Sequence, residues 1–599
     1  MRAAAAGRTR RRTPPSRTAR GSPSAAQGSR GRCGNRWERG RCAQPRVRPG
    51  RDGLSCGAIM RHLRRLGHSV AAGAVAGAAL APLQLLLWPE VALPPLKIAL
   101  AVLAWTSWGA VWLGAALFAL TEIAGVFMPY LGTARGFSIG IWRWMMAVVA
   151  FLVAAAAWWN REETRDLLLK DNRHALAWAG SVATLFWIAF LVQAIRRRPR
   201  HHPLARAAIV AGVLVAWLWG IWAVAPRPVS EAATVEPPRF APAHKLLFVS
   251  WEGADLTWIL PAMERGDMPF LRGCWEGGAW GQLRTVHPYT RSATLATLVT
   301  GCAPAVHGIL GRSSYRISWL TPGPVTLLLV GPWPSPHQLP WWGWRRTPGL
   351  APQRATLWQI LAATGRKVGL VGWPGYARGT WTVPRLTTAQ AIRAAALDPD
   401  LKASLDAALR PDPRLAADAR GSFALAAAIG AAAQRRARAH PVDALAVDFE
   451  LAAHLRPRWT AEEPGGPEEV LRLAARMLDD ELGKLWRLMG EDTLLVVVSP
   501  YGLAAPSPWQ RLIHLGAPPR RWKVSPTDSP DGFAFFYGPG VRPGTRLRGG
   551  RLADVTATIL YFLELPVARD MAGRVMLEAV TDERAAAVPL RLVPSYPAP

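Results

Sequence analysis

Glu252 is the first residue along the chain whose position suggests chemistry. It follows a mostly apolar run, Leu246–Ser250, and comes directly before Gly253 in a turn. A short apolar run that ends in a glycine-containing turn indicates a buried strand of an α/β sheet. Ligands of such sheets bind outside the carboxyl ends of the strands, so the Glu252 carboxylate is expected at a site. A carboxylate in that place is suited to hold a cation.

The five cysteines add little further chemistry. They are Cys33, Cys42, Cys56, Cys274 and Cys302, and no two of them form a C-x-x-C pair. The spacing therefore does not indicate a thiolate zinc site. Two interpretations of Cys274 and Cys302 stay open: a disulfide, if their domain lies outside the cytoplasm, or two buried thiols.

Strands and helices that could position Glu252 alternate from residue 245 to about residue 580. Strand-like runs cover 246–250, 368–371, 444–449, 493–499 and 533–537, and helical stretches include 356–363 and 468–489. Such alternation predicts one α/β domain, a mostly parallel sheet flanked by helices. The Trp-rich segment 311–350 interrupts it, either as a packed insertion or as a loop on a membrane surface or a partner. Residues 581–599 are expected to be a C-terminal tail.

The region 60–226 is apolar and predicts membrane-spanning helices. Five spans are each close to the ~20 residues that cross a ~30 Å hydrocarbon layer. They are 69–88, 97–120, 139–159, 175–195 and 206–225. We therefore expect an integral membrane protein anchored in the lipid bilayer by a five-helix bundle, with a Pro/Ala/Glu/Val-rich linker at 227–244.

Arginines in the short loops predict the orientation of these spans. If every span crosses, the clusters at 61–65, 135–143 and 196–206 fall on one side, whereas the loop 161–173 on the other side is near neutral. Cytoplasmic loops carry the excess of Lys and Arg. The N-terminus is therefore expected in the cytoplasm, and the C-terminal domain is expected to be extracytoplasmic.

The net charge of +32 is unevenly spread. Residues 1–59 hold fifteen arginines against Glu38 and Asp52 alone, without apolar periodicity. Such a segment cannot bury enough apolar surface to fold alone. A disordered basic arm and an untranslated stretch upstream of a start at Met60 both stay open. Because the charge lies in this arm and in loops between apolar spans, we expect no nucleic-acid partner.

Six stretches between 245 and 580 resemble the type I phosphodiesterase/nucleotide pyrophosphatase branch of the alkaline phosphatase superfamily. LATLVTGCAPAVHGI (295–309) is similar to the family's TG-x-x-P-x-x-HGI segment, and GEDTLLVVVSPYG (490–502) resembles its last metal-binding strand. The other four are 268–288, 356–375, 529–544 and 552–580. Their order implies an α/β alkaline-phosphatase-like domain over 245–580, so the expected fold class is an N-terminal five-helix transmembrane bundle plus this domain.

The resemblance implies phosphoester hydrolysis with two divalent metals, usually zinc. Two such cations stabilise the attacking and leaving oxygens and lower the pKa of a Ser or Thr nucleophile. Carried over by position, the Asp after the first strand is Glu252 here, and the nucleophile is Arg291. The remaining ligand positions fall near Ala453 and Pro457, with His454 beside them but out of register, then at Pro500-Tyr501, and finally at Asp528.

Of the positions carried over, only Glu252 and Asp528 could bind a cation, and two carboxylates do not build a binuclear zinc site. Arg291 would repel a metal and could pair with Glu252. It could also bind a phosphate-containing anion, for which a guanidinium is well shaped. We therefore interpret the site as catalytically degenerate, expect no metal cofactor, and take Arg291 and Glu252 as ligand-binding candidates. A bare ion pair of Arg291 with Glu252 or Asp528 is the alternative.

Three functions stay open. The first is a membrane-anchored binding or scaffold subunit for an anionic ligand or a membrane protein partner. The second is an active hydrolase or phosphotransferase on phosphodiester or phospholipid head-group substrates, which would use zinc or another divalent metal. The third assigns the function to the transmembrane bundle. An active site would use Thr290 or Ser292 as nucleophile and would recruit His287, His307 or His454, although His307 is also consistent with a packed turn residue.

Overall fold

A computed structural model describes most of the chain beyond residue 55. The described residues are 56–87, 95–127, 134–195, 233–238, 244–287, 289–311, 314–317, 325–326, 344–347, 351–375, 377–387, 413–459, 467–502 and 531–597, with the single positions 215, 390 and 399. The chain forms two units, Met1–Ile59 and Met60–Pro599. The basic arm expected over 1–59, the fifth span at 206–225 and the candidate Asp528 therefore lie almost wholly outside the described residues.

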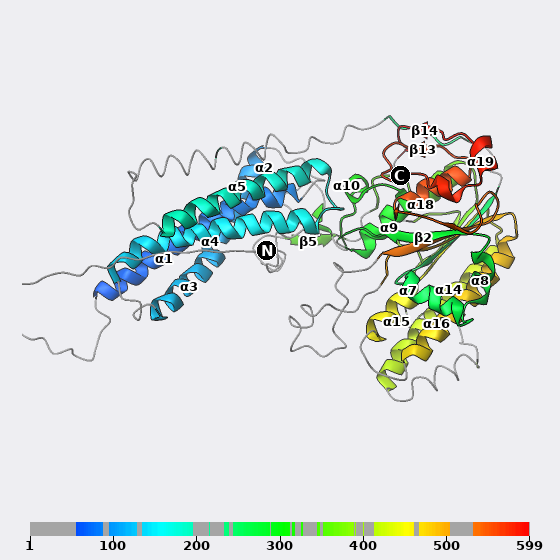
Figure 1. Ribbon diagram of the computed structural model, residues 1–599, viewed down its shortest axis with the longest axis horizontal. Coiled ribbons are helices and arrows are strands. Elements are labelled where there is room, and N and C mark those ends of the chain that lie inside the picture. The colour runs from blue at the N-terminus through cyan, green and yellow to red at the C-terminus, as the bar shows by residue number, and fades with distance from the viewer. Residues whose placement is uncertain are drawn as a thin grey trace, which may run out of the picture. The chain divides into compact units, whose positions relative to one another are not determined.

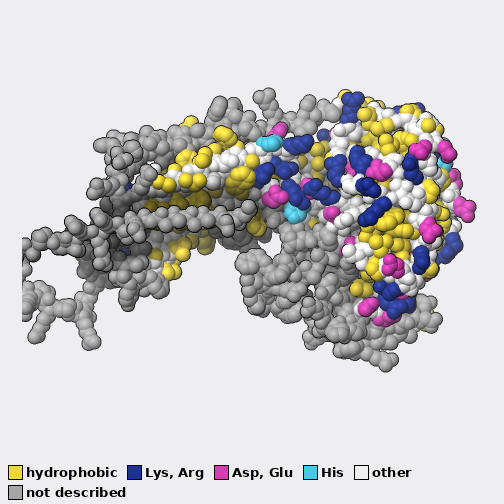
Figure 2. Space-filling model, in the orientation of Figure 1, with side chains coloured by type: hydrophobic (Ala, Val, Ile, Leu, Met, Phe, Trp, Pro, Cys, Tyr) yellow, Lys and Arg dark blue, Asp and Glu magenta, His cyan; other side chains and the backbone are white. Residues whose placement is uncertain are grey.

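Four apolar stretches near the N-terminus are helical and long enough to cross a membrane. They are His62–Leu86, Leu96–Gly125, Arg143–Glu162 and Lys170–Ile195. These stretches lie in α1 (Cys56–Leu86), in α2 (Pro95–Trp108) with the π-helical η1 (Gly109–Leu113) and α3 (Gly114–Phe127), in α4 (Ala134–Glu163) and in α5 (Lys170–Ile195). Large apolar side chains such as Leu103, Val111 and Leu185 are exposed along them. Figure 2 shows this apolar surface in yellow, as expected of helices that face lipid.

Glycines allow α1 to approach the second apolar stretch closely. A Cβ atom at Gly77 would lie 2.1 Å from the carbonyl oxygen of Trp105, and one at Gly73 would lie 2.3 Å from that of Gly109. Small residues permit this backbone contact between apolar helices. On another side, the Asn172 side chain donates to the carbonyl oxygen of Leu86 (2.7 Å) and ties α5 to the end of α1. Figure 1 shows α1, α4 and α5 side by side.

The α/β domain is built on a nine-stranded sheet. Its order is β11-β2-β10-β9-β1-β8-β6-β7, with β12 beside β2. The strands are β1 (Lys245–Trp251), β2 (Ala279–Arg284), β6 (Val368–Val371), β7 (Trp381–Val383), β8 (Ala444–Phe449), β9 (Thr493–Ser499), β10 (Gly532–Tyr537), β11 (Thr545–Arg546) and β12 (Gly550–Arg551). Only β10 runs antiparallel to its neighbours among these strands. The mostly parallel sheet predicted from the sequence is confirmed.

Helices cover both faces of this sheet (Figure 1). In β1, Leu247 and Val249 join one apolar core, and Leu246 and Phe248 join the other. The first core includes α7 (Leu256–Glu264), α8 (Pro269–Trp275), α14 (Pro413–Ala439), α15 (Leu451–Trp459) and α16 (Pro467–Met489). The second includes α9 (Arg291–Thr300), α11 (Leu357–Ala363) and α18 (Asp554–Phe562). Burial on both faces explains why the central strands are almost wholly apolar.

Cys274 and Cys302 are free and buried, so the disulfide interpretation is wrong. Cys274 lies in α8 and belongs to the core on one face of the sheet. Cys302 follows α9, which packs on the opposite face. A disulfide needs Cα atoms within about 7 Å, which two opposite faces do not provide. The interpretation as two buried thiols is the one that holds.

Segments outside the expected boundaries of the domain also pack against it. Residues 581–597, expected as a tail, form α19 (Asp582–Ala587) and β14 (Leu592–Val593), which pairs with β13 (Val567–Ala568). A bridge between Thr234 and Ser595 fastens part of the expected linker. In the turn after α4, Asp166 accepts hydrogen bonds from the Arg284 side chain (3.0 Å) and the His287 backbone (3.1 Å).

The described parts of the Trp-rich segment form a small antiparallel sheet. It consists of β3 (Ser314–Ile317), β4 (Val325–Thr326) and β5 (Trp344–Thr347). The rest of the segment lies outside the described residues.

Candidate functional site

Three carboxyl groups meet at the carboxyl ends of β1 and β8. These strands are parallel, and Trp251 is the register partner of Phe449. The residues that follow, Glu252 and Glu450, therefore leave the sheet side by side, and Asp448 lies two positions before Glu450. Glu252, Asp448 and Glu450 are all buried, and one oxygen from each lies within 4.8 Å of the others.

Arg291, the first residue of α9, inserts its guanidinium among these three groups. Its Nε donates to Glu252 (2.6 Å) and its Nη2 donates to the other oxygen of the same carboxylate. Nη2 also lies 3.0 Å from Asp448 and 2.5 Å from Glu450. The Arg291–Glu252 ion pair expected from the sequence is therefore present, and two further acids surround the same guanidinium.

A second layer of side chains surrounds the cluster. Arg385, in the loop after β7, donates to Glu450, and Nε2 of His454 lies 3.4 Å from the same carboxylate. Tyr501, which follows β9, donates from Oη to Glu252 (3.1 Å). The ring of Tyr289 lies against that of Tyr501, with 4.1 Å between the centroids. A tyrosine hydrogen bond thus stands where the resemblance placed an Asp-His pair.

Burial and neighbouring charges set the protonation of the cluster. Burial works against the ionised form of Glu252, but the Arg291 guanidinium outweighs it and lowers the pKa of this carboxyl. Burial, together with the charge of Glu252, raises the pKa of Asp448 well above its ordinary value. Asp448 is therefore the acid of the cluster that keeps its proton most readily, whereas Glu252 favours the ionised form. Glu252 and Glu450 lie against the guanidinium of Arg291, and Glu450 also lies against that of Arg385.

The residues present do not fit a pair of metal ions. The guanidinium of Arg291 fills the space that the three carboxyl groups enclose and would repel a cation there. Asp448 Oδ1, which is buried, accepts no hydrogen bond from any residue that the structure describes. That oxygen could coordinate a cation, but a cation could reach it only if the Arg291 side chain moved away.

The hydroxyl groups considered as nucleophiles do not join the cluster. Thr290 Oγ1 donates to the carbonyl oxygen of Leu310 (3.4 Å). Ser292 is half-buried, and its side chain makes no hydrogen bond to Glu252, Asp448 or Glu450 in the described part of the chain. Neither hydroxyl therefore has one of these carboxylates as a base, and Asp528 lies outside the described residues.

Sequence reasoning missed Asp448, Glu450 and Arg385, and it named His454 only as out of register or as a residue that an active site would recruit. It placed the expected ligands near Ala453 and Pro457, whereas the structure brings Glu450 and His454 to the site. A signal existed: Phe449-Glu450 repeats the aromatic–Glu ending of the first strand, and His454 follows Glu450 at helical i,i+4 spacing. Arg385 had no such signal, because only the tertiary fold brings the loop after β7 to β8.

His307, in α10 (Pro304–His307), is a packed turn residue. Its Nδ1 accepts from the Ile309 backbone N–H (3.1 Å), so Nε2 carries the proton and donates to Thr297 (3.0 Å). Burial lowers the pKa of His307 from 6.5 to about 3. Both ring nitrogens already have hydrogen-bond partners, so neither is available as a metal ligand or as a base.

We expect His307 to make the fold acid-sensitive. The unfolded chain binds a proton at this residue below about pH 6.5 and the folded chain does not, so stability should fall as the pH drops from there. His307→Gln cannot take up that proton. Thermal unfolding of the full chain at about pH 7 and about pH 4.5 should show a smaller drop for the variant than for the wild type. Parallel drops would refute the assignment.

The family comparison agrees with this fold. The family model for type I phosphodiesterase / nucleotide pyrophosphatase matches residues 246–559, more than half of the chain. A search of curated proteins found no match.

Several solved structures are similar to this chain. Murine ectonucleotide pyrophosphatase / phosphodiesterase 5, solved as an inactive variant with AMP, has 12% identity and a TM-score of 0.36 over 58% of this chain and 99% of its own. Phosphonoacetate hydrolase from Sinorhizobium meliloti has 18% identity and a TM-score of 0.29, over 48% and 65%. A sulfatase-like protein from Bacteroides thetaiotaomicron has 11% identity and a TM-score of 0.36, over 56% and 74%. By its match to the family model, the chain belongs to the type I phosphodiesterase/nucleotide pyrophosphatase family.

Proposed function

We propose that this chain is a membrane-anchored member of its family that has lost metal-dependent hydrolysis and acts as a binding or scaffold subunit. One observation carries the proposal: a guanidinium, that of Arg291, lies among the three buried carboxyl groups. The cluster is neutralised from within by arginine, so it needs no metal to be stable. The absence of a carboxylate beside Thr290 and Ser292 among the described residues also argues against a built nucleophile.

The ligand that suits this site is an anion that carries phosphate. The floor of the site is acidic and buried, but the groups at its rim are basic: the side chains of Arg291, His454 and Arg385 are 27%, 36% and 42% exposed. Nη1 of Arg291 makes no hydrogen bond to any described residue, and guanidinium groups bind oxyanions in a forked geometry. An oxyanion at the rim would therefore meet Arg291 and Arg385 without displacing the carboxylates.

One feature of the topology proposed from the arginine-rich loops has structural support: the turn after α4 shares a side with the α/β domain. The turn after α4 and the α/β domain are hydrogen-bonded through Asp166 and Arg284. In the proposed topology, this turn and the domain lie on the same, extracytoplasmic side of the membrane. The opposite orientation of α4 and α5 would separate the two by the bilayer.

A metal analysis combined with an activity assay tests the proposed function. The full chain, purified in detergent without chelators, should contain substoichiometric zinc and should not cleave a p-nitrophenyl phosphodiester, with or without added Zn²⁺ or Mn²⁺. Inorganic phosphate should bind in a calorimetric titration, and Arg385→Gln should weaken it by about tenfold or more, as expected for a charged hydrogen bond. Stoichiometric zinc with turnover that a chelator abolishes would instead support the hydrolase.

A second candidate, a hydrolase with a single metal ion, has one observation in its favour. Glu252, Asp448 and Glu450 each offer an oxygen to a common point, and His454 stands beside Glu450. It requires Arg291 to swing away from all three acids at once. The same metal analysis separates it from the degenerate interpretation.

A further inference from the structure

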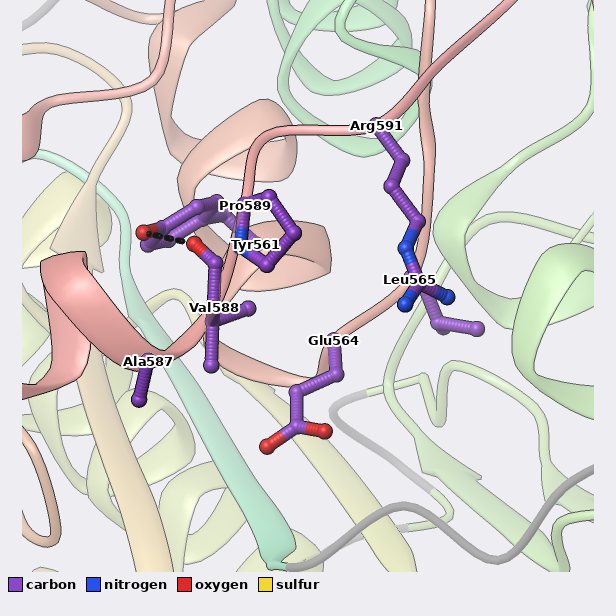
Figure 3. A pocket seen from close by; sticks show the side chains of 7 residues that line it. All are labelled: Tyr561, Glu564, Leu565, Ala587, Val588, Pro589 and Arg591. Atoms are coloured by element: carbon purple, nitrogen blue, oxygen red, sulfur yellow. Dashed lines mark hydrogen bonds between the residues drawn. The ribbon is translucent and has the colours of Figure 1, made fainter.

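A cavity of about 220 Å³ lies in the C-terminal part of the domain and shares no residue with the carboxylate cluster. One wall is the end of α18, with Tyr561, Glu564 and Leu565. The other wall is the segment 587–591, between α19 and β14. Figure 3 shows the side chains of Glu564 and Arg591 around this cavity.

Hydrogen bonds hold both walls in place. Tyr561 Oη donates to the carbonyl oxygen of Val588 (2.7 Å) and joins one wall to the other. The carbonyl oxygen of Arg591 accepts from the Val567 backbone N–H (2.9 Å), next to the pairing of β13 with β14. The cavity is therefore formed before any ligand enters, which lowers the entropic cost of binding.

Glu564 adopts a backbone conformation that glutamate rarely takes. Its φ of 59° is positive, and no other non-glycine residue in the described part of the chain has a positive φ. Helix α18 ends here in a left-handed turn, with the Leu565 N–H on the Leu560 carbonyl (2.8 Å). Glycine is the usual residue at this position because it carries no strain. A glutamate that keeps this conformation suggests that its carboxylate has a use.

Glu564 and Arg591 put opposite charges on one cavity. No ion pair joins the two among the described residues. Glu564 pairs instead with Arg584 (3.3 Å), which does not line the cavity, and Arg591 is exposed. A simple anion in the cavity would meet the carboxylate, and a simple cation would meet the guanidinium. Only a ligand with both charges pairs with both residues, and its carbon spacer would lie against Leu565 and Pro589.

We propose that this cavity binds a small zwitterion. Its carboxylate or phosphate pairs with Arg591, which presents a forked set of donors to an oxyanion. Its ammonium group pairs with Glu564. A short aliphatic spacer joins the two, as in an amino acid or an aminoalkyl phosphate. This site is independent of the proposed function of the carboxylate cluster.

Calorimetric titration of the full chain in detergent tests the proposal with a series of ligands of increasing spacer length. The probes are the ω-amino acids from glycine to 6-aminohexanoate, together with phosphoethanolamine. One spacer length should bind best, and the alkylamine and alkyl carboxylate of the same length should bind at least about tenfold more weakly, because each loses one charged partner. Equal binding of a single-charge analogue would overturn the zwitterion.

Charge-removing variants decide whether the cavity is the site. Arg591→Gln and Glu564→Gln should each weaken the best probe by about tenfold or more. Glu583→Gln and Arg569→Gln remove exposed charges of the same signs that do not line the cavity, and should bind as the wild type does. Thermal unfolding verifies that all four variants are folded. No binding by the wild type, or undiminished binding by the first two variants, refutes the proposal.

Discussion

Arg291→Ala is expected to lower the free energy of unfolding by about 3–5 kcal/mol, the usual cost of removing one partner from a buried ion pair. The side chains of Glu252, Asp448 and Glu450 are only 1%, 0% and 4% exposed, so water cannot take over the role of the guanidinium. Urea unfolding of the full chain in detergent, followed by tryptophan fluorescence, measures the loss.

Two matched variants separate charge from side-chain size. Arg291→Lys keeps the charge but loses the fork that reaches all three acids, so its loss should fall between the wild type and the alanine variant. Arg574→Ala removes the exposed partner of Glu578, a pair worth at most about 1 kcal/mol. If Arg291→Ala and Arg574→Ala unfold alike, the buried cluster does not depend on its guanidinium.

The loss should also shrink on acidification. Without Arg291, burial raises the pKa values of the acids in the folded chain above those in the unfolded chain. The folded state then binds more protons as the pH falls, so the variant gains stability toward about pH 5 relative to the wild type. This trend is opposite to the one expected from His307, and the two can be told apart in the same titration.

The fold could be predicted from the sequence because its signals are local. β6, β8 and β9 were predicted with the bounds that the structure gives them, since strands buried on both faces are mostly apolar along their length. α11 begins after Thr356, whose hydroxyl caps the helix together with Gln359. Four of the five apolar spans correspond to helices, and the fifth lies outside the described residues.

The site was predictable only in part, because it depends on strand register. Glu252 stood out since it follows an apolar run, and Arg291 was named beside it because the resemblance put this residue at the nucleophile position. Asp448 lies within the apolar run that forms β8, where a single acidic residue gave no sign of a site. Its importance becomes visible only when β1 and β8 are aligned, with Ser250 opposite Asp448. That alignment belongs to the tertiary structure, and the pattern of apolar residues along the chain does not predict it.

Arg291→Ala is also expected to turn the cluster into a site for one divalent cation. The variant keeps three carboxyl groups with oxygens within 4.8 Å of one another, and Asp448 Oδ1 has no hydrogen bond to give up within the described chain. Carboxylate oxygens in such a set suit Mn²⁺ or Zn²⁺. A cation at a hundredfold excess over its Kd would stabilise the variant by about 2.7 kcal/mol.

Thermal unfolding of the variant with and without Mn²⁺ or Zn²⁺ measures this gain, and elemental analysis after gel filtration counts the bound ion. The wild type should show neither effect, because the Arg291 guanidinium occupies the space between the three carboxyl groups. Adding Glu252→Gln and Glu450→Gln to the variant should abolish the response, since amides neutralise no cation. A wild type that responds as strongly as the variant would show that Arg291 does not exclude metal. The stability that the ion restores and the stability that the arginine supplied have one origin, a positive charge among buried acids. The gain from the ion should grow with its concentration in the variant and should not add to the stability of the wild type.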